Sequence, residues 1–439
     1  MIIVLRTRRH SKYFGALLLL VVILTGIPLF LFFQGLPTEE NVIPLPQPDV
    51  DGSMLLSTAM KNPGFSNALR NHQMKLGEIS QLLWAIQGMT HDHAFRAIPS
   101  AGGTYPLEIY VAQVDDSELG EGYYHYSPED HQLERIDSTI SRDRIISPFE
   151  GDDRLAVSNV STVFFILAEY SRTTNRYGNR GVQYVHLETG HAVQNFLLQL
   201  TSLGLKTRPI THFIVEQIQV LLNTSYVPLV ALPVGLGNEI LQESLDDSHF
   251  HVSNEDESTL EQSIAKRKST REYTNGTLPF TVLSDILNDS RSITYLECIS
   301  SLLDVRVVVG DVDGLFRGSY HYWIHNGSFT LISPLDLQED LMTAGLNQPW
   351  IEIAQLDVVI SVDSDWIDTQ SDPNFAHQMA MINVGMMAQN IYLKCAAYNL
   401  GTVTVGAFYE NDVSTVIDLP SGFKPIYIMP IGLTSEFVG

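Results

Sequence analysis

The chain contains little cysteine and little charge for its length. Its 439 residues include two cysteines, Cys298 and Cys395, which are too few for a disulfide framework or for a zinc site of the usual spacing. The two could form one bridge in an oxidising compartment, or they could be small buried hydrophobic side chains. With 17% charged and 44% hydrophobic residues, the composition is that of a folded chain with sizeable cores.

Basic residues are also scarce. Lysine and arginine number 26 against 50 aspartate and glutamate residues, which gives a net charge of −24. Because binding to nucleic-acid phosphates requires a concentrated basic surface, this charge argues against a nucleic-acid partner. A length of 439 residues predicts two domains of roughly 150–200 residues each.

A long apolar run lies near the N-terminus. Residues 14–33 (FGALLLLVVILTGIPLFLFF) contain no charged residue over about the 20 residues that a bilayer core requires. A basic tail, residues 1–13, precedes this run, and a proline-rich acidic tether, residues 34–52, follows it. The pattern predicts a retained single-pass transmembrane anchor. The bias of lysine and arginine predicts a membrane protein with its N-terminus in the cytoplasm and its main body outside.

The rest of the chain consists of two similar segments. An acidic linker, residues 238–258, separates residues 53–237, here called the first repeat, from residues 259–439, the second repeat. The string GHAVQN at 190–195 matches GMMAQN at 385–390, and each repeat ends in a hydrophobic run with Pro-x-Gly. Strand-like runs mixed with long helices predict an α+β fold. The duplication predicts that the two repeats pack as an intramolecular pseudo-dimer.

The most distinctive string of the first repeat is RAIPSAGGTYPLE, at residues 96–108. A serine beside two glycines lets the backbone approach a planar or anionic ligand and offer several N–H donors. The prolines stiffen the loop on both sides. The alternative is a plain turn before a strand. The candidate ligand-binding residues are Pro99, Ser100, Ala101, Gly102 and Gly103.

The second repeat opens with the string KRKSTREY, at residues 266–273. Four cations around a hydroxyl suit a phosphate group, because arginine forms forked hydrogen bonds and serine donates one. The alternatives are a helix capping box, for which Ser269 and Glu272 have the required spacing, and a solvated charged surface. The candidate phosphate-binding residues are Arg267, Lys268, Ser269 and Arg271.

Together these strings resemble the nitroreductase-like flavoenzymes. The spelling of residues 99–108 is similar to the SagB/ThcOx-type dehydrogenase branch, and so are QLLWAIQG at 81–88 and GHAVQN in the first repeat. The resemblance implies two fused nitroreductase-like units with FMN at their interface. In that family one unit supplies the basic cluster for the phosphate, and the other supplies the Pro-Ser loop beside the flavin ring. It also implies a backbone contact near the ring at Leu400 and Gly401.

The two motifs survive in different repeats. The second repeat keeps the basic cluster and the first keeps the Pro-Ser loop, whereas their counterparts at residues 60–66 and 299–304 lack arginine and Pro-Gly residues respectively. We therefore expect one intact composite FMN site and one degenerate site per chain.

The resemblance also suggests a catalytic residue. The azoline-oxidising members carry a Lys-Tyr pair ahead of the Gly-His helix, and the matching pair here is Arg176-Tyr177. Arginine stays charged and cannot act as a base, so Tyr177 is the candidate that donates or relays a proton. His191 could be a proton shuttle or a packed helix residue. No metal site is predicted, because His91 and His93 lack further spaced ligands.

These observations predict an FMN-dependent oxidoreductase of the SagB-type. It would transfer hydride or electrons to or from a small-molecule or peptide substrate, with a nicotinamide, a quinone or oxygen as its electron partner. One alternative is a membrane-tethered nitro or quinone reductase. An alternative of another class is a flavin-free binding module that has lost catalysis.

Overall fold

The computed structural model describes residues 41–62, 64–91, 95–115, 117–137, 140–237, 258–291 and 302–437. Contacts group the chain into two compact units, Met1–Val42 and Ile43–Gly439, and the second unit holds both repeats.

The first repeat is built on an antiparallel sheet. Among the described residues it has eight strands in the order β1-β7-β6-β5-β8-β10-β2, with β9 beside β10. Its central strand β8 reads TVFFILA and is buried along its whole length, as expected for β-branched and aromatic residues covered on both faces. The strands are β1 (Val42–Pro44), β2 (Leu69–Arg70), β5 (Leu107–Gln113), β6 (Gly122–Ser127), β7 (Gln132–Asp137), β8 (Thr162–Ala168), β9 (Lys206–Thr207) and β10 (Val227–Gly237), with a separate pair β3 (Met89–Thr90) and β4 (Phe95–Arg96).

The second repeat has a matching sheet. Within the described part of the chain its order is β13-β12-β11-β14-β16-β15, which repeats the order β7-β6-β5-β8-β10-β9 of the first sheet. The duplicated topology confirms the tandem arrangement expected from the sequence repeat. Its strands are β11 (Leu303–Val309), β12 (Gly318–Trp323), β13 (Ser328–Ser333), β14 (Leu356–Asp363), β15 (Gly401–Thr402) and β16 (Phe423–Gly432).

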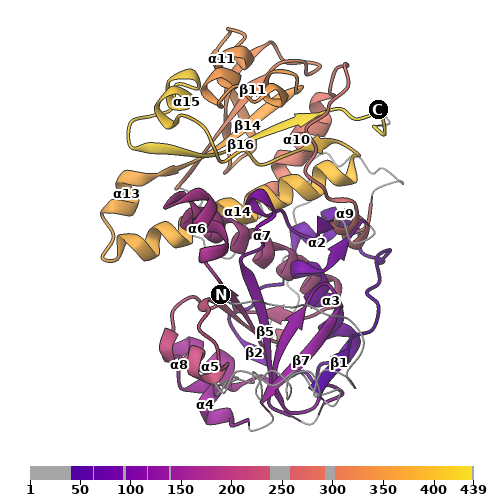
Figure 1. The fold of residues 1–439 in the computed structure, drawn as a ribbon. Coiled ribbons are helices and arrows are strands. Elements are labelled where there is room, and N and C mark those ends of the chain that lie inside the picture. The colour runs from indigo at the N-terminus through magenta and orange to yellow at the C-terminus, as the bar shows by residue number, and fades with distance from the viewer. Residues whose placement is uncertain are drawn as a thin grey trace, which may run out of the picture. The chain divides into compact units, whose positions relative to one another are not determined.

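Two long helices lie between the sheets, as Figure 1 shows: α7 (Arg180–Ser202) and α14 (Pro373–Ala397). They meet at Gly190 and Gly385, whose Cα atoms face the partner backbone: a Cβ on Gly190 would lie 2.0 Å from the carbonyl oxygen of Ile382. Shorter helices surround this pair. They are α2 (Leu56–Lys61), α3 (Leu76–Gln87), α4 (Arg142–Ile146), α5 (Gly151–Ser158), α6 (Ser171–Tyr177), α8 (Val215–Leu221), α9 (Leu260–Lys266), α10 (Phe280–Ser290), α11 (Gln338–Ala344), α12 (Pro349–Glu352), α13 (Ser364–Asp368) and α15 (Glu410–Val416).

The helix crossing is joined by paired amide side chains. Gln194 Nε2 donates to Asn390 Oδ1 at 2.8 Å, and Gln389 Nε2 donates to Asn195 Oδ1 at 2.8 Å. These four residues are the Gln-Asn dipeptides of the two repeated strings, and all are buried. The repeated spelling is therefore explained by a reciprocal set of hydrogen bonds across the pseudo-twofold axis.

The fold corrects one part of the sequence prediction. Among the described residues, no helix combines the length and the apolar character needed to cross a membrane. The two longest, α7 and α14, carry the buried amides at their crossing. The predicted anchor, residues 14–33, lies outside the described residues. The structure therefore does not support the predicted transmembrane helix, nor the membrane location and orientation that depended on it. What remains is an α+β fold of two nitroreductase-like units.

Candidate functional site

A cavity of about 190 Å³ is lined by residues of both repeats. The first repeat contributes the loop at residues 99–102 and side chains from the end of α6 and the first half of α7. The second repeat contributes residues 403–407, Gln348, two residues from the middle of the basic string and one residue of β16. The side chains from helices, basic string and β16 are Tyr177, Tyr184, Glu188, His191, Ser269, Arg271 and Tyr427.

The Pro-Ser loop forms a short 3-10 turn, Ala101–Gly103, that requires its glycines. Gly102 and Gly103 have φ values of 61° and 65°, in the left-handed region that glycine adopts without strain. A Cβ on Gly102 would also lie 2.3 Å from the hydroxyl of Tyr177. Arg176 Nη1 donates to the Gly102 carbonyl oxygen at 3.0 Å, so α6 holds the loop in place.

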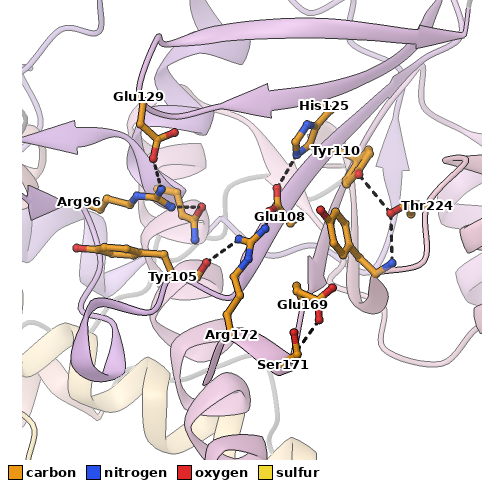
Figure 2. A network of polar contacts seen from close by, with 12 residues as sticks. Arg96, Tyr105, Glu108, Tyr110, His125, Glu129, Glu169, Ser171, Arg172 and Thr224 are labelled. Carbon is orange, nitrogen blue, oxygen red and sulfur yellow. Dashed lines mark hydrogen bonds and ion pairs between the residues drawn. The ribbon is translucent and has the colours of Figure 1, made fainter. Parts of the chain in front are cut away.

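A network of polar contacts fixes the chain that follows this loop (Figure 2). Arg172 donates to the carbonyl oxygen of Tyr105 at 2.9 Å and also to the carboxylate of Glu108. His125 Nε2 lies 2.6 Å from the same carboxylate, and the Arg96 guanidinium lies over the Tyr105 ring at 4.2 Å. Burial opposes ionisation of Glu108, but His125 and Arg172 outweigh it and lower the pKa of this carboxyl. The network therefore positions the loop.

Arg267 links the two repeats beneath the loop. Its side chain is buried, and it donates from Nε to the carbonyl oxygen of Ala97 at 3.0 Å and from Nη2 to that of Arg96 at 2.9 Å. Its Nη1 has no hydrogen-bond partner among the described residues. Burial lowers the pKa of this guanidinium. The residue that the sequence assigned to phosphate binding thus also braces the start of the Pro-Ser loop.

The other residues of the basic string divide into two groups. Ser269 and Arg271 line the cavity, and the Ser269 hydroxyl lies 3.0 Å from the Tyr392 hydroxyl. The exposed Arg271 lies over the Trp350 ring at 5.4 Å. Lys268 is exposed and does not line the cavity.

Leu400 and Gly401 support the basic string and do not line the cavity. Both are buried, and Gly401 pairs with Gly432 between β15 and β16. A Cβ on Gly401 would lie 2.8 Å from Cγ2 of Thr270, so only glycine fits behind the string. Residues 403–407, a few positions further along, form the cavity wall. Gly103 also lies off the wall, although Ala101 and Gly102 beside it are on it.

Two buried residues of α7 face the cavity: sequence reasoning missed Glu188 and left His191 open between a proton shuttle and a packed helix residue. Glu188 is 3% exposed and its Oε1 has no hydrogen-bond partner among the described residues. Burial raises the pKa of Glu188 to about 8, although a hydrogen bond with Ser100 and the charge of Arg96 act in the opposite direction.

His191 is 1% exposed, and its Nδ1 lies 2.9 Å from Oε1 of Gln389. Because Gln389 uses its Nε2 to donate to Asn195, this oxygen is the acceptor and His191 carries its proton on Nδ1. Nε2 then has a free lone pair, and it has no partner among the described residues. Burial lowers the pKa of His191 to about 3. His191 is therefore both a packed helix residue and part of the cavity wall.

Tyrosines form the aromatic part of the wall. The Tyr177 and Tyr184 rings meet edge to face with their centroids 5.2 Å apart. The Tyr184 hydroxyl donates to the carbonyl oxygen of Gly406 at 2.9 Å, which joins α7 to the segment at 403–407. The structure thus places Tyr177 at the cavity, while the preceding Arg176 bonds the Pro-Ser loop.

The equivalent positions of the other repeat carry different residues. The backbone N–H groups of Thr270 and Ser66 make equivalent bonds to β15 and β9. Phe65 therefore replaces Ser269, and Asn67 replaces Arg271. On α14, Asn383 and Met386 correspond to the acid and the imidazole of α7. The counterpart of the Pro-Ser loop, residues 299–304, lies partly outside the described residues.

No group of three or more possible metal ligands occurs in the described part of the chain. Of the histidine pair noted in the sequence, His91 is described and donates from Nε2 to the carbonyl oxygen of Lys266 at 3.2 Å, whereas residues 92–94 lie outside the described residues.

Comparisons with known proteins agree with this architecture. The model of the nitroreductase family matches residues 68–236 and 319–433, which is more than half of the chain. A nitroreductase-family protein of Methanocaldococcus jannaschii is 40% identical over 163 residues, covering 37% of this chain and 81% of that protein. The trifolitoxin-processing protein of Rhizobium leguminosarum is 28% identical over 137 residues, covering 29% of this chain and 36% of that protein.

A crystal structure of a nitroreductase-family protein from Anabaena variabilis superposes with a TM-score of 0.69. The match covers 89% of this chain and 93% of that one at 19% identity, so it shows the fold. Fold and family together define an oxidoreductase of the flavin-dependent class. More narrowly, the chain belongs to the nitroreductase family, as a tandem pair of nitroreductase-like units.

Proposed function

We propose that the chain is an FMN-dependent oxidoreductase of the SagB type, with one flavin held in the cavity between the repeats. The observation that carries the proposal is the composition of the cavity wall. It brings residues 99–102 of the first repeat together with Ser269 and Arg271 of the second. These residues belong to the two motifs that the sequence retains, one in each repeat.

The polar atoms of the site fit a ligand of this kind. Buried polar groups are nearly always paired, yet Nη1 of Arg267, Nε2 of His191 and Oε1 of Glu188 have no partner among the described residues. They offer a cationic donor, a neutral acceptor and a carboxyl group. A flavin nucleotide has a phosphate, hydroxyl groups and a ring edge with both donors and acceptors, so it can satisfy all three.

The residues present suggest how the nucleotide is held. Arg271 and Ser269 would bind the phosphate, with Lys268 adding long-range charge and Arg267 reaching from below. The glycines of the Pro-Ser loop would let the flat ring approach the backbone, and Leu400 and Gly401 would hold the basic string from behind. When bound, FMN supplies hydride or electron transfer. The protein orients the substrate against the ring and excludes water.

The proposal includes a single flavin per chain. Phe65 and Asn67 remove the hydroxyl and the cation at the equivalent position, and Met386 replaces the imidazole. A phosphate at this position of the first repeat would lack the serine and the arginine that the basic string supplies in the second repeat.

The substrate is a small molecule or a peptide, and the electron partner is a nicotinamide, a quinone or oxygen. The name of the trifolitoxin-processing protein favours a peptide, whereas the name of the Methanocaldococcus relative favours a nitro compound. A nitro or quinone reductase is therefore the second candidate. A flavin-free binding module is the third, and the unpaired buried polar atoms argue against it.

The test is flavin content. The full chain is purified, saturated with FMN and desalted, and the flavin released by heat is quantified. We expect one FMN per chain in the wild type. Arg271→Ala should weaken binding about 10- to 100-fold, since a charge-assisted hydrogen bond contributes roughly 1.5–3 kcal/mol. Arg317→Ala is the matched control, because Arg317 is exposed and pairs with Asp336 on another surface. Two FMN per chain would contradict the single site, and none would contradict the function.

A further inference from the structure

Glu188 stands out among the groups that face the cavity. Among the described residues that line it, Glu188 is the only carboxylic acid. It projects from the middle of α7, one helical turn before His191, and Tyr184 lies one turn before it. Its side chain is buried, and Oε1 has no partner among the described residues. Glu261 and Asp357 also have an unpaired buried carboxylate oxygen there, but of these three acids Glu188 is the one that lines the cavity.

The surroundings of Glu188 favour its neutral form. Ionised carboxylates in protein interiors are stabilised by a cation or by several N–H donors. From the Pro-Ser loop, Glu188 receives one hydrogen bond, from the Ser100 side chain. Arg96 at β4, the cation whose charge acts on Glu188, is engaged by Glu129 and Gln87. Neither provides enough compensation for a buried negative charge.

The neighbours on α7 and β16 add no positive charge. From its own helix, His191 is neutral because its pKa lies far below 7, at about 3. From β16, Tyr427 is buried, and its pKa is raised well above the usual value by burial and by the charges of its neighbours, Glu188 among them. Two further cations are nearby: Arg267 acts on His191 and donates to backbone carbonyl oxygens, and Arg271 lines the cavity and lies over the Trp350 ring. Glu188 is therefore a carboxylic acid that carries its proton at neutral pH and faces the cavity.

We propose that Glu188 is the proton donor of this cavity and that the site works in the direction of substrate reduction. This inference rests on the proposed function. The substrate is an acceptor with a polarised double bond, such as a quinone C=O or a nitro N=O. Bound FMN, once reduced, would supply a hydride with its two electrons to one atom of that bond. The other atom takes the proton of Glu188 as its O–H bond breaks, and the resulting carboxylate is protonated again by water.

The opposite direction lacks a base. Removing hydride from a substrate also requires a group that takes up a proton, and a neutral carboxylic acid cannot do so. His191 has a free Nε2, but its low pKa makes it a weak base. The cavity wall is therefore better suited to giving a proton than to taking one.

The first experiment needs no flavin. Infrared spectra of the flavin-free full chain are recorded between pH 5 and 10 for the wild type and for Glu188→Gln. We expect the wild type to show, at pH 7, a carbonyl band of a protonated carboxyl that Glu188→Gln lacks. Asp357→Asn is the matched control, because Asp357 is a second buried acid whose pKa burial raises, away from the cavity. That variant should lose a different band. Absence of a Glu188-dependent band at pH 7 would overturn the proposal.

The second experiment uses the FMN-loaded enzyme, reduced beforehand and mixed with para-benzoquinone. In the wild type the reoxidation rate should fall as pH rises through about 8, where Glu188 loses its proton. Glu188→Gln, compared with the wild type at equal FMN loading, should react about 100-fold more slowly at pH 7 and lack the step near pH 8. Tyr177→Phe should keep that step. A wild-type rate in Glu188→Gln, or the same pH step, would contradict the role of Glu188.

The two experiments separate the two hypotheses. Failure to bind FMN would remove the proposed function while the infrared result still reports on the carboxyl. Normal FMN binding together with a quinone that is not reduced would contradict the direction of reaction proposed for this cavity.

Discussion

Replacement of Gly385 by alanine tests the contact between the two repeats. The Cβ of an alanine there would lie 2.1 Å from the carbonyl oxygen of Leu187 and 3.0 Å from Cα of Gly190. Both are backbone atoms of α7, so no side-chain rotation relieves the clash. Ordinary van der Waals contact begins near 3.4 Å, so the helices must separate by about 1 Å at their crossing.

The expected loss of stability follows from this displacement. Overpacking of a close-packed interior costs roughly 1–3 kcal/mol. The two amide hydrogen bonds across the crossing, from Gln194 to Asn390 and from Gln389 to Asn195, would lengthen, at about 1 kcal/mol each. Alanine stabilises a helix by about 1 kcal/mol relative to glycine, which offsets part of the loss. We expect Gly385→Ala to lower the free energy of unfolding by about 3 kcal/mol.

The assay is urea unfolding of the full chain, followed by near-ultraviolet circular dichroism. Gly77→Ala is the control: Gly77 is also helical, but a Cβ there would meet no atom within 4 Å. It should leave stability unchanged or raise it by up to about 1 kcal/mol. If Gly385→Ala unfolds at the same urea concentration as the wild type, or as Gly77→Ala, the close contact between α7 and α14 is not as described.

Three further predictions concern buried groups. Glu188 has a folded-state pKa of about 8 against 4.5 in the unfolded chain, so the folded state holds its proton more tightly and wild-type stability falls as pH rises between these values. The stability of Glu188→Gln relative to the wild type should therefore be about 3 kcal/mol higher at pH 7 than at pH 4. Urea unfolding at both pH values measures this, and the same stability difference at both would refute it. Lys394→Ala should lower stability by about 3 kcal/mol in the same assay, because the buried Lys394 ammonium pairs with both Asp285 and Asp289; a loss under about 1 kcal/mol would show that these pairs contribute no more than surface pairs do. Cys395 is buried and its thiol pKa is raised, so native Cys298→Ser should not react with a thiol reagent until it unfolds, and rapid labelling would show that Cys395 is accessible.

The sequence predicted the tandem fold because the repeat is visible in short strings. GHAVQN and GMMAQN keep glycine and Gln-Asn at the same spacing, and the structure shows why: the glycines permit the helix crossing, and the amides bond across it. The Pro-Ser loop was likewise readable, since glycine adopts the positive φ values found at residues 102 and 103 without strain, and a Cβ at residue 102 would clash with Tyr177. In both places the backbone itself demands particular residue types.

The residues of the cavity wall were harder to predict. Ser269 and Arg271 were found because cations around a hydroxyl are rare in so acidic a chain. Glu188 was missed, since one acid in a helix has no local pattern that distinguishes it from a solvated one. The contact of Arg267 with the start of the Pro-Ser loop was also missed, because its acceptors, the carbonyl oxygens of Ala97 and Arg96, belong to the other repeat.

The prediction of a transmembrane helix shows a different limit. It rested on a single composition window, and none of the helices that the structure describes supports a membrane span. Hydrophobicity without periodicity gives the length of an apolar segment but carries no information about its surroundings.

The sequence by itself determined the α+β class and the duplication, and it singled out the two candidate ligand-binding motifs, because each depends on local backbone geometry or on residue types at short spacing. Only the tertiary structure decided that the loop of one repeat and the basic string of the other line the same cavity. It also decided that a glutamate and a histidine one turn apart on α7 are buried there with unpaired polar atoms. Proximity across about 170 residues and the loss of solvent around a charged group are properties of packing, which no short segment specifies.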